Sequence, residues 1–134
     1  MEAIVLDTDT LIDYSKGYAP WIDELVQKGS VRLVLPTIVI AEFFASKTLD
    51  DPYEVEVADK TFALFSRQDL TEPIAKTLGG LLRHKTYPSG ASTADLIIAA
   101  TALFLGAPLA TRNKGHFRSI PDLTFFDPVT IKPA

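Results

Sequence analysis

The stretch Ala3-Ile4-Val5-Leu6-Asp7-Thr8-Asp9-Thr10 places two carboxylates directly after a run of mostly branched apolar residues. Such a run predicts a strand that is covered on both faces, as in a parallel sheet. Asp7 then falls at the carboxyl end of that strand, and open parallel sheets bind their ligands at this edge. The stretch therefore predicts an α/β fold with a polar site beside Asp7.

Outward from this stretch, predicted strands alternate with predicted helices. Further strands are expected at residues 32–35, 108–111 and 123–126. Helices are expected at about residues 9–14, 21–28, 37–49, 52–65, 73–85 and 93–105, from their caps, prolines and glycines. This order predicts one domain, residues 1–134, with a mostly parallel central sheet of about five short strands and helices on both faces.

Two further carboxylates stand alone in apolar segments. Glu42 is the only charged residue in the segment 33–45, and Asp95 is the only one in the segment 86–111. A carboxylate that is buried alone is costly and tends to take up a proton instead. Together with Asp7, these acids can stay ionised if a hard divalent cation completes the site. We therefore predict an acidic metal pocket.

Each of these acids also has a structural alternative. Asp7 can cap a helix after the strand, and Asp95 can be a first-turn acid favoured by the helix dipole. Glu42 can be a solvated residue, although it shares its helix face with Ile38 and Ala45. The helix-dipole alternative accounts well for Asp95 alone, but the alternatives account poorly for all three acids together.

Composition limits the class of protein. A hydrophobic content of 47% with 22% charged residues is typical of a globular domain. The absence of cysteine excludes disulfides and thiolate chemistry and is consistent with the cytoplasm. The segment 1–4 lacks the basic region of a signal peptide, and the apolar segment 96–110 is too short to span a bilayer. We therefore expect a cytoplasmic protein with no membrane association.

The net charge of −4 argues against broad nucleic-acid binding but permits a basic rim around an acidic pocket. The densest basic segment follows the predicted strand 108–111. We expect Arg112 and Lys114 to contact phosphates, with Lys47 as a further candidate. For His116 three roles are open: a phosphate contact, a neighbour of the metal or a surface residue. Asp13 lies four residues after Asp9 and is expected to be solvated.

Four segments resemble the motifs of PIN-domain ribonucleases, especially the VapC toxins of prokaryotic toxin–antitoxin pairs. They occur in the order of that family and extend over nearly the whole chain. The four segments are Ile4–Ile12, Pro36–Glu42, Asp95–Ala102 and Leu109–Phe117. Four such motifs in this order are fairly specific for the family.

The resemblance implies a set of catalytic residues, which are Asp7, Glu42, Asp95, Thr111 and Asn113. The three acids would hold Mg²⁺ or Mn²⁺, and Thr111 would orient the water or a ligand. Asn113 occupies a position that is often an aspartate in relatives, and His116 stands where many relatives carry an acid. Because an amide is neutral and imidazole suits Mg²⁺ poorly, we expect one tightly held metal ion rather than two.

By the same resemblance we expect a metal-dependent endoribonuclease that hydrolyses RNA phosphodiester bonds and serves as the toxin of a VapBC-type pair. The expected partners are an RNA substrate, a cognate VapB-like antitoxin and a second copy of the chain in a homodimer. Aromatic residues in the segment 21–65 are expected mainly in the core, with some at an interface. They include Phe43, Phe44, Phe62 and Phe65.

Two alternatives use the same residues. The segment Asp7–Thr10 after an apolar strand also matches the opening of haloacid-dehalogenase-like phosphatases, in which the first aspartate attacks phosphorus. Those enzymes also need a later lysine and a closing acidic pair at strand ends, and Asp95 has no second acid beside it. The other alternative is a catalytically silent PIN domain that binds RNA or a protein partner.

Overall fold

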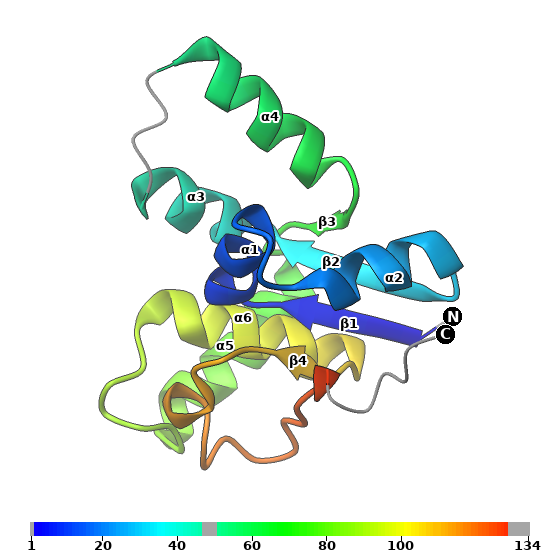
Figure 1. The fold of residues 1–134 in the computed structure, drawn as a ribbon. Coiled ribbons are helices and arrows are strands. Elements are labelled where there is room, and N and C mark those ends of the chain that lie inside the picture. The colour runs from blue at the N-terminus through cyan, green and yellow to red at the C-terminus, as the bar shows by residue number, and fades with distance from the viewer. Residues whose placement is uncertain (1, 47–50, 129–134) are drawn as a thin grey trace.

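A four-stranded parallel sheet forms the centre of the computed structural model, which describes residues 2–46 and 51–128 (Figure 1). Its strands are β1 (Glu2–Leu6), β2 (Val31–Pro36), β3 (Ser66–Gln68) and β4 (Leu109–Ala110). They lie in the order β3-β2-β1-β4, and all three pairings are parallel. The predicted parallel α/β fold is confirmed, with four strands in the described residues rather than about five.

Six helices and one short 3-10 turn connect and cover the strands within the described residues. The helices are α1 (Thr8–Ser15), α2 (Pro20–Lys28), α3 (Thr37–Ser46), α4 (Pro52–Phe62), α5 (Glu72–His84) and α6 (Thr93–Leu105), and the 3-10 turn is Lys114–His116. Every predicted helix is found to within a few residues. The predicted end of the third helix, at residues 47–49, lies outside the described residues.

Two segments differ from the prediction. The edge strand β3 was not expected, because Ser66–Gln68 has no apolar pattern and its strand conformation depends on pairing with β2. The predicted strand 123–126 forms only an isolated bridge between Leu109 and Phe125. The backbone of Leu109 supports this bridge by donating to Thr124 and accepting from Phe126, each at 2.9 Å.

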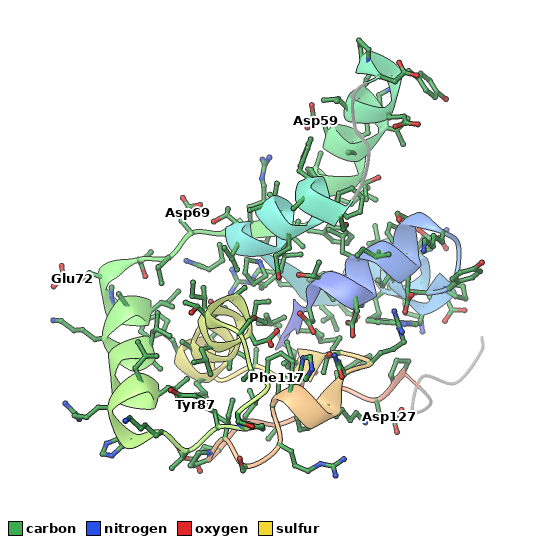
Figure 2. The ribbon with its side chains drawn as sticks, turned by 90° about the vertical axis from the view of Figure 1, so that its left-hand side faces the viewer. Asp59, Asp69, Glu72, Tyr87, Phe117 and Asp127 are labelled. Carbon is green, nitrogen blue, oxygen red and sulfur yellow. The ribbon has the colours of Figure 1, made fainter. Side chains whose placement is uncertain are left out.

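The helices cover both faces of the sheet. Helix α6 packs against β1, and α5 packs on the outer side of α6 (Figures 1 and 2). Helices α1 and α2 lie on the opposite side of the sheet in both views. A helix that is apolar nearly all round must be buried, and α6 accordingly buries Leu96, Ile98 and three alanines in its central turns.

Helices α3 and α4 form what we call the α3–α4 arm, residues 37–46 and 52–62, in which α4 stands away from the sheet (Figure 1). The ring of Phe62 joins the two helices, with its centroid 5.6 Å from that of Phe43 and 5.9 Å from that of Phe44. Phe43, Phe62 and Phe65 are buried, which confirms core packing for most of these aromatics. Tyr53 on α4 is instead 71% exposed.

Within the described residues, no helix combines the length and the apolar character that a bilayer crossing requires. Strand β1 lies between β2 and β4, so its carboxyl end has a neighbouring strand on each side. Asp7 directly follows that end.

Candidate functional site

Asp7 links the central strand to the first helix. It is the N-cap of α1, and its Oδ1 accepts a hydrogen bond of 2.7 Å from the backbone N–H of Thr8. Its Oδ2 accepts one of 2.7 Å from the hydroxyl of Thr111, and the residue is only 5% exposed. Burial and the negative charges of Asp9 and Asp95 raise the pKa of Asp7 to about 7. Asp7 is therefore both a helix cap and a buried carboxylate whose ionised form is disfavoured.

Strand β4 brings the fourth motif to Asp7. The backbone N–H of Asp7 donates to the carbonyl of Ala110 at 3.0 Å, which fixes the register of the two strand ends. The buried hydroxyl of Thr111 also lies 3.3 Å from Oδ2 of Asp9 and accepts from the backbone N–H of Asn113 at 2.9 Å. Thr111 therefore orders two acids and the turn that carries Asn113.

Asp95 lies in the first turn of α6 and takes part in a capping box. Its Oδ2 accepts from the backbone N–H of Ser92 at 2.9 Å, and the Ser92 hydroxyl accepts from the backbone N–H of Asp95 at 3.1 Å. The same Oδ2 lies 3.3 Å from Nδ1 of His116, whose ring also contacts the Asn113 amide at 3.1 Å. Asp95 is thus a first-turn acid of α6, as its structural alternative predicts, and its charge also acts on Asp7. The pattern Ser-x-x-Asp is a sequence signal for this box.

Glu42 reaches the site through an intermediate residue that the sequence did not single out. Its Oε1 accepts a hydrogen bond of 2.5 Å from the hydroxyl of Thr8, which is the residue next to Asp7. Glu42 is half-buried on α3 and is therefore not a freely solvated residue. The third acid is held beside the first by a side chain from α1.

Two cations lie at the rim of these acids. Nε of Arg112 donates to Oδ2 of Asp13 at 2.6 Å, and this hydrogen bond and charge raise the pKa of Arg112. Asp13 is only 20% exposed, so the expectation that it is solvated was wrong. Nζ of Lys114 lies 5.8 Å from the ring centroid of Phe125. Lys47 lies outside the described residues.

The donor chemistry of the site suits a hard divalent cation. Carboxylate oxygens are the ligands that Mg²⁺ and Mn²⁺ prefer, and a cation would offset the like charges that act on Asp7. Within residues 2–46 and 51–128, however, no three His, Cys, Asp or Glu side chains gather closely enough to hold a metal ion. The carboxylate of Asp95 faces its capping box, and that of Glu42 faces Thr8.

Comparison with known proteins identifies relatives of this chain. Residues 4–123 match the PIN domain family. The chain is 31% identical over 126 residues to Ribonuclease VapC19 of Mycobacterium tuberculosis, an alignment that covers 89% of this chain and 95% of that protein.

Solved structures give the same result for the fold. A chain in the DNA-bound VapBC structure from Salmonella typhimurium is 26% identical with a TM-score of 0.77, covering 96% of this chain and 99% of that one. A chain in the VapBC-1 structure from nontypeable Haemophilus influenzae is 27% identical with a TM-score of 0.75, covering 95% and 98%. From the match over residues 4–123 and the likeness to VapC19, this chain belongs to the PIN domain family.

Proposed function

We propose that this chain is a Mg²⁺- or Mn²⁺-dependent endoribonuclease that hydrolyses RNA phosphodiester bonds. The observation that carries the proposal is Asp7, a buried carboxylate whose pKa rises to about 7 because burial and two neighbouring acids, Asp9 and Asp95, disfavour its charge. Strongly shifted acids of this kind cluster at functional sites. Membership of the PIN family and the likeness to a ribonuclease support the choice of reaction and speak against the phosphatase alternative.

Asp7, Asp95 and Glu42 would hold the cation, and Asn113, which is neutral, favours a single tightly held ion. When bound, such a cation supplies Lewis-acid catalysis at the scissile phosphate and lowers the pKa of the attacking water. The protein contributes by fixing Asp7 through Thr8 and Thr111, so that its two oxygens keep one orientation.

The rim supplies the contacts to substrate. Arg112 keeps 66% of its side chain exposed while its Nε is bound to Asp13, so the guanidinium stays available to an RNA phosphate. Lys114 and His116 follow on the same turn, close to the acids. We infer RNA rather than DNA as the substrate from the relative named a ribonuclease.

We further propose that the chain is the toxin of a toxin–antitoxin pair in the cytoplasm, because similar solved chains come from VapBC structures. A cognate VapB-like antitoxin would insert a basic side chain into the acidic pocket, where charge complementarity favours it. A homodimer is also expected. The exposed side chains of Tyr53 and Val57 on α4 offer apolar surface for such contacts.

Cleavage of single-stranded RNA in Mg²⁺ or Mn²⁺ tests the proposal. We expect Asp7→Asn and Asp95→Asn to lower kcat/KM more than about a hundredfold, because each removes a negative oxygen ligand. Asp59→Asn is the matched control, since Asp59 is exposed on α4 and far from the 3-10 turn (Figure 2). Chelation with EDTA should abolish cleavage by the wild type and the control alike.

The opposite results distinguish the remaining alternatives. Cleavage that resists EDTA would contradict the metal-dependent mechanism. A purified, folded wild type that cleaves no RNA in either metal would instead identify a silent domain that retains the acids without using them.

A further inference from the structure

A hollow of about 330 Å³ opens beside the acids, where the end of α1 and the start of α2 approach β4. Its lining includes the aromatic side chains of Tyr18 and Trp21 and the cation Arg112. Thr111 lines it as well, and the hydroxyl of Thr111 donates to Asp7. The hollow and the acid site therefore share a wall.

The aromatic side of this hollow is held in place by packing. The ring centroids of Trp21 and Phe126 lie 5.1 Å apart with a tilt of 38°, and both rings are half-buried. Tyr18 is 74% exposed, more than any other large apolar or aromatic side chain in the described residues. Rings of this kind are the surfaces on which unpaired bases of single-stranded RNA stack.

The charged side of the hollow carries two cations and the carboxylate of Asp13, which is paired with Nε of Arg112. Lys114 and the exposed part of the Arg112 guanidinium remain available to a nucleic-acid backbone. Arg112 and Lys114 both line the hollow, and the side chain of Arg112 is 66% exposed. A second hollow of about 360 Å³ is lined by Glu2 and Val31, at the amino ends of β1 and β2, so it opens at the opposite edge of the sheet. Of these two hollows, only the first combines aromatic rings, two cations and a residue bound to Asp7.

We propose that the first hollow binds one unpaired nucleobase of single-stranded RNA, adjacent to the phosphate that lies over the acids. This inference rests on the proposed ribonuclease function and adds a position for the neighbouring nucleotide. The base stacks on Tyr18 and Trp21, while Arg112 and Lys114 contact the flanking phosphates. The volume is at the lower end of small-ligand pockets. A base inside a duplex is already paired and stacked, so the hollow selects single strands.

Trp21 is the only tryptophan of the chain, and its fluorescence therefore reports directly on this hollow. The Asp95→Asn variant, in which cleavage is expected to be lost, is titrated in Mg²⁺ with a short oligoadenylate. A matched oligomer of abasic ribose phosphates presents the same backbone without bases. We expect saturable quenching by oligoadenylate and roughly tenfold weaker binding of the abasic oligomer, without quenching.

Variants of the hollow test the same contact by cleavage. Tyr18→Ala should raise KM for single-stranded RNA roughly tenfold, because it removes one stacking surface. Phe104→Ala is the matched control, since Phe104 is an aromatic residue that is 49% exposed on α6 and outside the hollow. Trp21→Leu should raise KM in the same way. Trp21→Phe keeps an aromatic face, so its KM should stay close to the wild-type value.

The outcomes separate this inference from the proposed function. If the wild type cleaves RNA but Tyr18→Ala behaves like Phe104→Ala and oligoadenylate leaves the fluorescence unchanged, the base site is wrong and the ribonuclease function stands. Equal quenching by the abasic oligomer would indicate a phosphate site and would also overturn the inference. If the wild type neither cleaves nor binds RNA, the proposed function fails and the base site fails with it.

Discussion

The carboxyl end of β1 and the α3–α4 arm are dominated by different interactions, like charges in the first and packed aromatic rings in the second. At the end of β1, burial raises the pKa of Asp7 to about 7, and the negative charges of Asp9 and Asp95 add to this effect. In the arm, the ring of Phe62 packs against two other phenylalanines. Crowded like charges cost stability when no cation is bound, whereas buried rings contribute it. The difference separates a region built for chemistry from one built for packing.

Phe62→Ala tests the packing side of the comparison and should have the largest effect. Phe62 is 3% exposed, so its truncation leaves a cavity between α3 and α4 and should lower the free energy of unfolding by about 3–5 kcal/mol. Urea unfolding measures this loss. Phe104→Ala on α6 is the control, because Phe104 is 49% exposed and its loss should matter far less. Equal losses for both variants would refute the packing role.

The pH dependence of stability tests the charged side. Because the pKa of Asp7 rises from 3.8 to about 7 on folding, the folded protein holds this proton more tightly than the unfolded chain. The resulting stability is complete below pH 3.8, declines as the pH rises, and is lost above about pH 7. Asp7→Asn removes this dependence. In EDTA, the free energy of unfolding of Asp7→Asn should therefore exceed that of the wild type by a margin that grows with pH. Between about pH 5 and about pH 8 this margin should grow by at most about 3 kcal/mol.

Thermal unfolding across this pH range, with Asp59→Asn as the control, measures the difference. Addition of Mg²⁺ at about pH 8 should raise the melting temperature of the wild type more than that of Asp7→Asn, by preferential binding to the folded state. A parallel pH profile for the wild type and Asp7→Asn would show that Asp7 is ionised without cost.

Ser92 and Asp95 share one capping box. Substitutions of the two residues separate helix capping from the proposed catalytic role of Asp95, and they should change stability least among these variants. Ser92→Ala removes the hydroxyl that accepts from the backbone of Asp95 and should cost about 1 kcal/mol, with RNA cleavage retained. Asp95→Asn keeps a side-chain oxygen for the cap but loses the charge, so cleavage should fall while stability stays similar. Loss of cleavage in Ser92→Ala alone would place the cap within the catalytic site.

The elements that sequence predicts well are those whose own residues determine them. Strands β1 and β2 are largely apolar runs, and α6 begins after a readable cap and ends just before its C-cap Gly106. Strand β3 was missed because the polar residues Ser66–Gln68 become a strand only through pairing with β2. Tertiary pairing there overrides local propensity.

The same limit applies to the site. The position of Asp7 and Thr111 at strand ends follows from the sequence. The contacts of Asp13 with Arg112 and of Thr8 with Glu42 join residues that are 99 and 34 positions apart, and neither pattern nor spacing specifies them. Which acids could hold a metal remains a prediction, because their final orientation depends on such distant partners.

The hydrogen bond between Thr111 and Asp7 spans 104 positions of the chain, and this has a consequence for biosynthesis. All three predicted metal-binding acids are translated before Leu109 and Ala110, which form β4. Until β4 is made, the backbone N–H of Asp7 lacks its acceptor on Ala110. Contacts between residues so distant in sequence form late, since closing a long loop is entropically costly. For the proposed nuclease, we therefore expect Asp7 to gain the contacts that orient its carboxylate only after β4 has been made.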